Sequence, residues 1–359
     1  MVQEPDELQK LTKRKLKSIL NDDEKTALAA HLVYVSDSAP GIERKKEGQD
    51  FTYYFKDKKI TDDEDLLRIK HLVIPPAWEK VWICPKENGH LQATGYDTKN
   101  RKQYKYHTNW IKVRNHTKFY RMLHFGKALS EIRKKLKSDI NQEGLPLTKV
   151  LALVVTLMEN THIRIGNHVY EKEYGSFGLT TLKDRHVIIA GGKAKFNFVG
   201  KKGVHHDIDL KNKKLVKLIQ QCRDIPGREL FQYYDEDGKH YAIDSGMVNN
   251  YIHEISEDTF TAKDFRTWSG TVLAYRALKD AGCCESDAET KRQIVAALDE
   301  VSSLLGNTRT VCKKYYVHPG ILTLYEEKKL DKFVNGDTKS NGSEFLPEEN
   351  EVMKILETV

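Results

Sequence analysis

A helix without a polar face is the sequence feature that most constrains the fold of this chain. Residues 147–160 are apolar on nearly every side. Their most apolar part, residues 150–158, is far shorter than the about 20 residues that span a bilayer. Such a helix is stable only when other elements cover it all round. The sequence therefore predicts a larger, mainly helical domain with this helix in its core.

The chain before this helix has a different character. Five short segments, rich in β-branched and aromatic residues, are separated by Gly, Asp, Asn and Pro, which is typical of strands and turns. These segments are residues 31–35, 51–56, 80–84, 90–94 and 103–107. We interpret residues 31–113 as a small, mostly β domain, preceded by a polar lead-in over residues 1–30.

Helical periodicity prevails from residue 114 onward. An amphipathic helix is expected at residues 116–139, because apolar residues recur there at three- and four-residue steps. A β-rich interval follows the buried helix, with glycine-rich turns between its strands. The expected strands are residues 178–182, 186–190, 195–199 and 204–210, and the expected later helices are about 244–256, 262–281 and 286–305.

The predicted fold class is therefore α+β. A small, mostly β N-terminal domain precedes a larger, mainly helical domain, residues 114–327, whose sheet contains β-hairpins. Residues 328–359 form a charged C-terminal extension.

Composition narrows the class of protein. Lys and Arg number 59 against 52 Asp and Glu, a net charge of +7 that is compatible with a polyanionic partner. The five cysteines are scattered without a Cys-x-x-Cys pair, which favours a reducing compartment. The first residues lack the basic and apolar parts of a secretory signal. We expect a cytoplasmic protein that does not associate with membranes.

Side chains suited to phosphate chemistry occur at five separate places. They are Arg164 after the buried helix, Lys201 and Lys202 between two strands, Arg266 at a helix start, Asn307 after a helix, and Tyr315 and Tyr316 beside several cations. A tyrosine hydroxyl near cations is a plausible nucleophile, because cations favour the phenolate and attract an anionic substrate. The chain has no Walker loop, no Gly-x-Ser-x-Gly motif and no acidic cluster, so neither a metal site nor a cofactor is predicted.

Two arginines, a lysine, an asparagine and a tyrosine fit attack on a phosphodiester. Planar guanidinium groups match the two non-bridging oxygens, on which negative charge develops. The tyrosine conserves the bond as a phosphotyrosine ester, and a lysine ammonium can protonate the departing alkoxide. Taken singly, each residue also has an ordinary explanation, such as a surface ion pair, a solvated turn or a helix cap. Taken together, they favour catalysis.

In their order along the chain, these residues and their neighbours resemble the type IB DNA topoisomerases, in the short form of poxviruses and bacteria. The resemblance covers roughly residues 25–325. Its motifs are Ile74-Pro-Pro-Ala-Trp-Glu-Lys-Val-Trp82, Leu91-Gln-Ala-Thr-Gly-Tyr-Asp97, Arg101-Lys-Gln-Tyr-Lys-Tyr-His107, Arg164-Ile-Gly-Asn167, Phe198-Val-Gly-Lys201, Lys263-Asp-Phe-Arg-Thr-Trp268, Leu305-Gly-Asn-Thr308 and Tyr316-Val-His-Pro319.

The resemblance implies a role for each candidate. Arg164 and Arg266 correspond to the arginines that bind the scissile phosphate. Lys201 corresponds to the general acid, because the family places it directly after the glycine of this hairpin; Lys202 is the alternative. Tyr316 corresponds to the nucleophile, because an apolar residue, His and Pro follow it.

Asn307 stands where poxviral members carry a histidine. It can donate a hydrogen bond to a phosphate oxygen but cannot transfer a proton near neutral pH. Gln103, Tyr104 and Tyr106 match residues that contact DNA, and Lys263 belongs to the same DNA-binding set. Alternation along a strand would place both tyrosines on one face and Gln103 on the other.

The implied function is relaxation of supercoiled duplex DNA without ATP, metal or cofactor. The two domains would form a C-shaped clamp on the DNA, and the protein would act as a monomer without an obligatory protein partner, in the nucleoid if it is bacterial. A tyrosine recombinase uses nearly the same residues, but its helical DNA-binding arm is replaced here by the β-rich residues 31–113. A DNA-binding protein without catalysis is the third possibility.

Overall fold

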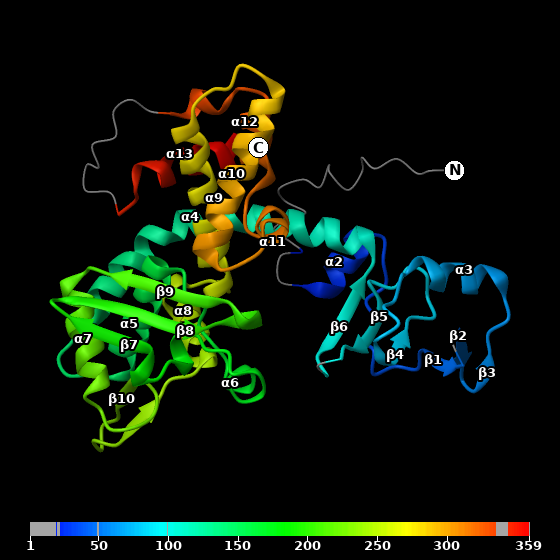
Figure 1. Ribbon diagram of the computed structural model, residues 1–359, viewed down its shortest axis with the longest axis horizontal. Coiled ribbons are helices and arrows are strands. Elements are labelled where there is room, and N and C mark those ends of the chain that lie inside the picture. Colours follow the sequence, from blue (N-terminus) through cyan, green and yellow to red (C-terminus); the bar gives the residue numbers. More distant parts are fainter. Residues whose placement is uncertain (1–18, 20–21, 49, 99, 335–343, 359) are drawn as a thin grey trace. The chain divides into compact units, whose positions relative to one another are not determined.

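A six-stranded antiparallel sheet dominates the first of the two units into which the chain divides, Met1–Arg121 (Figure 1). The computed structural model describes residues 19, 22–48, 50–98, 100–334 and 344–358. The strands lie in the order β3-β2-β1-β4-β5-β6. They are β1 (Ile42–Glu47), β2 (Asp50–Phe55), β3 (Lys58–Lys59), β4 (Glu79–Ile83), β5 (Leu91–Tyr96) and β6 (Lys102–Tyr106).

Two short helices bury the apolar side chains of this unit. α3 (Asp63–His71) contributes Ile69 to a core that includes Ile83 of the sheet. α2 (Asp23–Ala29) forms a second core with Trp110. The sheet therefore has the apolar cover that a small β unit needs for stability.

Four of the five predicted strands are confirmed as β2, β4, β5 and β6. The prediction of a strand at residues 31–35 is wrong, because Val33 forms only an isolated bridge with Gly89 among the described residues. The sequence does not predict β1 or α3. β1 is largely charged, and Ile42 is its one buried residue, so the alternation that marks a half-buried strand is absent.

The apolar helix predicted at residues 147–160 is α5 (Leu147–Thr161), and it is buried within the second unit, Met122–Val359. It packs against α7 (Lys213–Arg223), α8 (Ser245–Ser256) and α9 (Ala262–Ala281). The prediction of a helical domain around this element is confirmed, and the fold class is α+β.

α4 (Thr108–Ile140) begins in the first unit and ends in the second. It contains the predicted helix at residues 116–139 but starts eight residues earlier. Trp110 and Val113 explain the earlier start, because they join the core formed by α2. Their partners are far away in sequence, so the local pattern does not reveal them.

A three-stranded antiparallel sheet belongs to the second unit. Its strands are β7 (Val187–Ala190), β8 (Lys193–Val199) and β9 (His205–Leu210), in that order. Gly191 and Gly192 form the β7–β8 turn with φ of 56° and 73°, as the turn requires. The prediction of a strand at residues 178–182 is wrong. Residues Leu179–Thr181 form a 3₁₀ helix, held by backbone hydrogen bonds to the segment after α5.

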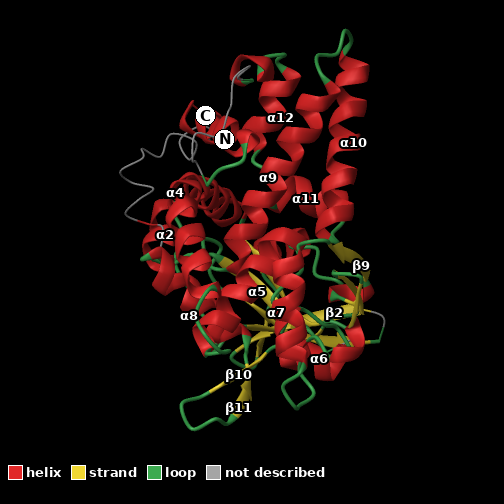
Figure 2. Ribbon diagram, turned by 90° about the vertical axis from the view of Figure 1, so that its left-hand side faces the viewer, coloured by secondary structure: helices red, strands yellow, loops and turns green. Residues whose placement is uncertain are grey.

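The remaining helices of the second unit lead to the C-terminus. The helices predicted at 244–256, 262–281 and 286–305 are confirmed as α8, α9 and α10 (Asp287–Leu305). α9 and α10 pack side by side with α12 (Pro319–Glu326) (Figure 2). Within the described ranges, no helix combines the length and apolarity needed to cross a bilayer. The other elements are α6 (His168–Tyr174), β10 (Gln232–Tyr234), β11 (His240–Ala242), α11 (Arg309–Tyr315) and α13 (Pro347–Thr358).

Candidate active site

The backbone that carries Arg164 is held on both sides. His162 ends α5 in the left-handed conformation, with φ of 56°. The amide groups of Leu179 and Thr180 then donate hydrogen bonds of 2.8 and 2.6 Å to the carbonyl oxygens of Arg164 and Ile165. Because the buried α5 is itself rigid, this pairing gives the Arg164 side chain a fixed base.

The Arg164 guanidinium reaches the turn that follows α10. It donates hydrogen bonds of 3.2 Å to the carbonyl oxygen of Gly306 and 2.6 Å to Oδ1 of Asn307. Gly306 caps α10 in the left-handed conformation, with φ of 57°. The amide of Asn307 donates to the carbonyl oxygen of Ser302 at 2.9 Å. Two candidates that are 143 residues apart in the chain are therefore in direct contact.

Arg266 is the buried centre of the site. Only 5% of it is exposed, and it donates hydrogen bonds to the carbonyl oxygens of His162 and Leu305, the second at 2.7 Å. It thereby joins the end of α5 to the end of α10. Its Nε is buried without a hydrogen-bond partner in the described part of the protein. Its guanidinium carbon lies 5.5 Å from the centroid of the Tyr316 ring.

Two residues of α9 position Tyr316. Gly270 follows Arg266 by four residues and therefore shares its side of the helix, and Thr271 is the next residue along the chain. The Thr271 hydroxyl donates to the carbonyl oxygen of Tyr316 at 3.1 Å and accepts from the amide of His318 at 3.0 Å. A Cβ atom at Gly270 would lie 2.9 Å from the carbonyl oxygen and 3.0 Å from the Cβ of Tyr316. Glycine at this position allows the close approach.

The two adjacent tyrosines have different surroundings. Tyr316 is half-buried beside Arg266. Tyr315 is 41% exposed, and its ring lies 5.3 Å from the ammonium nitrogen of Lys314. Tyr316 is thus the tyrosine that lies beside the candidate arginines.

Lys201 opens the 3₁₀ helix Lys201–Gly203 between β8 and β9. The side chain is exposed overall, and its Nζ lies 5.6 Å from the centroid of the Tyr170 ring. Partial removal from water lowers its pKa, and the positive charge of Arg164 lowers it further. Lys202 and Lys263 add smaller effects of the same sign, whereas Tyr316 opposes them. Lys201 therefore interacts electrostatically with both Arg164 and Tyr316.

Lys263, a predicted DNA contact, lies exposed in the first turn of α9. Its carbonyl oxygen accepts a hydrogen bond of 3.0 Å from the Thr267 hydroxyl. Because the Lys263 side chain is exposed and lies outside the core, it adds positive charge near Lys201.

The two arginines form a concentrated positive charge. Burial lowers the pKa of both, and their mutual repulsion lowers that of Arg266 further. Guanidinium groups nevertheless remain protonated near neutral pH. In the described residues, neither arginine has a carboxylate within ion-pair distance, and their hydrogen-bond partners are carbonyl and amide oxygens together with the Tyr316 side chain. An anion such as a phosphate diester would complement this charge.

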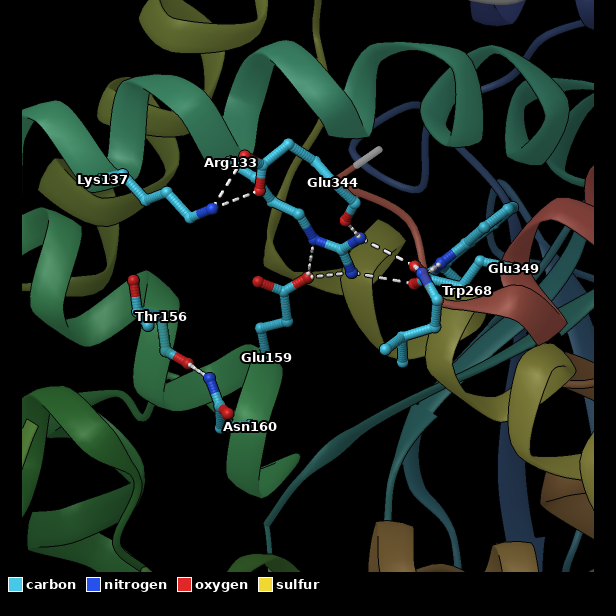
Figure 3. A network of polar contacts seen from close by, with 9 residues as sticks. Arg133, Lys137, Thr156, Glu159, Asn160, Trp268, Glu344 and Glu349 are labelled. Carbon is cyan, nitrogen blue, oxygen red and sulfur yellow. Dashed lines mark hydrogen bonds and ion pairs between the residues drawn. The ribbon is translucent and has the colours of Figure 1, made fainter. Parts of the chain in front are cut away.

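A polar network holds the other side of α9 (Figure 3). Arg133 of α4 donates hydrogen bonds of 2.7 and 2.8 Å to the Glu349 carboxylate of α13 and one of 2.8 Å to Glu159 of α5. The Trp268 indole of α9 donates to the same Glu349 at 2.9 Å. This network connects α13 to the helix that carries Arg266.

The two carboxylates of the network differ. Burial opposes ionisation of Glu349, but the hydrogen bonds from Arg133 and Trp268 outweigh it and keep its pKa below the ordinary value. Burial raises the pKa of Glu159, and Arg133 only partly offsets this effect. Glu349 is therefore the principal anionic partner of Arg133.

The predicted DNA-contacting residues of the first unit lie on β6. Tyr104 and Tyr106 are 49% and 42% exposed, and their rings stack with centroids 6.0 Å apart. Gln103 is half-buried, and its amide donates to the Asp97 carboxylate at 3.0 Å. The two tyrosines therefore share one exposed face. The Trp110 ring, buried in the core formed with α2, lies 6.5 Å from that of Tyr106 and supports this face from within.

Sequence reasoning missed three supporting positions. His162 supplies the carbonyl oxygen that Arg266 binds, and Gly270 with Thr271 holds Tyr316. A glycine inside a helical pattern was the available signal, because it often marks a close approach. For metal ions, the described ranges contain no group of three or more His, Cys, Asp or Glu side chains suited to binding one.

Comparison with known proteins identifies related sequences over most of the chain. The model of the eukaryotic DNA topoisomerase I catalytic core matches residues 102–336, and that of the bacterial DNA topoisomerase IB N-terminal domain matches residues 50–97. The chain is 33% identical to DNA topoisomerase 1B of Acanthamoeba polyphaga mimivirus, over 80% of this chain and 88% of that protein. It is 23% identical to DNA topoisomerase I of Monkeypox virus, over 82% of this chain and 95% of that protein. It is 22% identical to DNA topoisomerase 1B of Vaccinia virus (strain Copenhagen), over the same shares of the two chains.

Proposed function

The chain belongs to the type IB DNA topoisomerase family and is an enzyme of that type, and from this premise we propose that it relaxes supercoiled duplex DNA by cutting and rejoining one strand through Tyr316. The half-buried position of Tyr316 beside Arg266 supports this choice of nucleophile. The cationic surroundings attract the negatively charged phosphate that this oxygen attacks.

The Tyr316 oxygen attacks the scissile phosphorus and loses its proton to solvent. A bond forms between this oxygen and phosphorus, and the bond from phosphorus to the 5′-oxygen breaks. The products are a 3′-phosphotyrosyl link and a free 5′-hydroxyl. After the DNA has rotated about the intact strand, the 5′-hydroxyl attacks the phosphotyrosine and restores both the DNA and the tyrosine.

Arg164, Arg266 and Asn307 stabilise the charge that develops on the phosphate. The uncompensated charge of the two guanidiniums and the fixed base of each side chain support this role, because preorganised donors lose little energy to rearrangement. The Nε of Arg266 is buried and has no hydrogen-bond partner in the described residues, so the protein itself leaves this donor unused.

Lys201 protonates the departing 5′-oxygen. Its lowered pKa supports this role, since an ammonium that loses its proton more readily is a better acid at neutral pH. Lys202 is the alternative acid on the same turn.

Duplex DNA is the proposed substrate and partner. The β6 aromatic face and Lys263 contact it, and the two units close on it as a C-shaped clamp. The enzyme acts as a monomer in the cytoplasm, or at the nucleoid of a bacterium. Cleavage and rejoining exchange one phosphodiester for another of similar energy, so the cycle needs no ATP. The two arginines supply positive charge that metal-dependent enzymes take from a cation.

One observation carries this proposal: four candidate residues from separate elements of the chain lie together. They are Arg164, Arg266, Asn307 and Tyr316. Relaxation of a supercoiled plasmid in EDTA without ATP tests the proposal. We expect the wild type to relax the plasmid and Tyr316→Phe to leave it supercoiled. Absence of relaxation by the wild type would contradict the proposal, and recombination between two marked sites would favour a tyrosine recombinase.

A further inference from the structure

His206 of β9 occupies a defined place beside the candidate active site. It is the direct cross-strand partner of Phe198 on β8. The two rings stack with centroids 4.9 Å apart and planes 18° from parallel. Strand pairing and stacking together fix the imidazole on one face of the sheet.

Gly200 shows how closely the imidazole approaches the loop of Lys201. A Cβ atom at Gly200 would lie 2.6 Å from Nε2 of His206, too close for any real contact. The backbone of Gly200 is extended, with φ of −95° and ψ of −166°, a conformation open to residues with side chains. Glycine is therefore needed here because of His206, and this glycine directly precedes Lys201.

The His206 ring also lies close to the backbone of Gly306. A Cβ atom at Gly306 would lie 2.6 Å from Cε1 of His206. Gly306 precedes Asn307, and its carbonyl oxygen accepts a hydrogen bond from Arg164. One imidazole therefore lies between the backbone before Lys201 and the backbone before Asn307.

The charge of His206 suits this position. Burial lowers its pKa to about 4, with further contributions from the positive charges of Arg164 and Arg266. The ring is therefore neutral near pH 7 and adds no repulsion to the two arginines. A lysine or arginine side chain of similar length at this position would repel the two arginines.

We propose that His206 is a positioning residue for strand cleavage, because its ring sets the separation between the Gly200–Lys201 loop and the Gly306–Asn307 turn. It acts through these segments and does not itself touch the reacting atoms. The inference rests on the proposed roles of Lys201 as general acid and Asn307 as phosphate ligand. Without the ring, the loop has no fixed distance from the phosphate-binding turn.

Single-turnover cleavage by His206→Ala at saturating enzyme tests this role. The substrates are an ordinary DNA duplex and a matched duplex with sulfur in place of the bridging 5′-oxygen, since a thiolate leaves without a proton donor. A positioned general acid contributes about 10²- to 10⁴-fold. We expect the ordinary duplex to be cleaved at least about tenfold more slowly and the sulfur duplex to lose much less. Wild-type rates, or equal losses on both substrates, would overturn the proposal.

A double substitution tests the steric relationship directly. Gly200→Ala alone should slow cleavage, because its Cβ meets the imidazole. In the background of His206→Ala that conflict is absent, so Gly200→Ala should cause little further loss. Strict additivity of the two losses would overturn the proposal, because residues in contact are expected to be coupled.

Ile208→Ala is the matched control for stability. Ile208 lies on the same strand and face as His206, two residues further along, and pairs with Phe196. This substitution should lower the melting temperature while the cleavage rate stays close to that of the wild type. A loss of cleavage equal to that of His206→Ala would show that general loosening of the sheet explains both, and would overturn the proposal.

The experiment separates two kinds of failure. If the wild type forms no covalent adduct with either duplex, the proposed function is wrong. If the wild type forms the adduct and His206→Ala cleaves both duplexes at the same rates as the wild type, only the inference about His206 is wrong.

Discussion

Arg164 donates a hydrogen bond of 2.6 Å to Oδ1 of Asn307. The acceptor atom of the Asn307 amide is thus used within the protein. Among the residues that the structure describes, its Nδ2 makes only a long contact of 3.5 Å, with the carbonyl oxygen of Leu305. The nitrogen is therefore the atom through which Asn307 can serve a phosphate oxygen, as a hydrogen-bond donor.

Asn307→Asp should damage cleavage more than Asn307→Ala. Alanine removes one donor to a charged group, worth about 1.5–3 kcal/mol or about 10- to 150-fold in rate. Aspartate keeps an acceptor for Arg164 but neutralises the arginine and repels the phosphate, which should cost at least about tenfold more. Single-turnover cleavage rates measure both variants. An aspartate variant as active as the alanine variant would show that this amide does not face the phosphate.

Arg266→Lys should behave as a severe change in spite of its conserved charge. A lysine ammonium lacks the planar fork with which Arg266 binds the carbonyl oxygens of His162 and Leu305. We expect cleavage to fall by about 100-fold or more, as for loss of a preorganised donor, together with a lower melting temperature. Arg276→Lys, on an exposed part of the same helix, is the control. Similar effects of the two substitutions would refute a special role for Arg266.

The rate of cleavage should fall at alkaline pH as Lys201 loses its proton. Burial and the charge of Arg164 place the pKa of Lys201 below the ordinary value of 10.5. Because the acid must be protonated, activity is complete below the lowered pKa and is lost as pH rises through it. Lys201→Arg should be slower but should lack this alkaline decline, since a guanidinium keeps its proton. A pH profile of single-turnover cleavage checks the prediction, and an unchanged decline in Lys201→Arg would contradict it.

Arg133→Met should destabilise the second unit strongly. The substitution leaves Glu159 and Glu349 buried without their cation, and breaking a buried ion pair from one side costs about 3–5 kcal/mol. Lys137→Met removes an exposed partner of Glu344 in the same region and should cost far less. Urea unfolding measures both losses. Equal losses would show that the network around α13 adds nothing specific to stability.

Much of the helical part of the fold is predictable because its signals are local. α5 has an unbroken apolar sequence, and α9 begins at residue 262 with the capping pair Thr261 and Asp264. β1 and the early start of α4 are not predictable in this way. β1 is nearly all charged, and the first turns of α4 are stabilised by residues near position 30.

The candidate site likewise has features that are predictable from the sequence and features that are not. The residue types and their order along the chain identify Arg164, Arg266 and Tyr316, because phosphate chemistry demands guanidinium groups and a nucleophile. The contacts of Arg266 with two carbonyl oxygens are not predictable, since every helix end offers carbonyl groups. The place of His206 between two glycines depends on three elements meeting in space, which no local pattern encodes.

Covalent trapping with a suicide duplex tests the central claim, that Tyr316 is the nucleophile, most directly. After cleavage, the short strand with the free 5′-hydroxyl dissociates from this duplex and leaves the enzyme attached to DNA. We predict that the wild type and Tyr315→Phe give the adduct on a denaturing gel, and that Tyr316→Phe does not. An adduct with Tyr316→Phe, or its loss with Tyr315→Phe alone, would contradict the account.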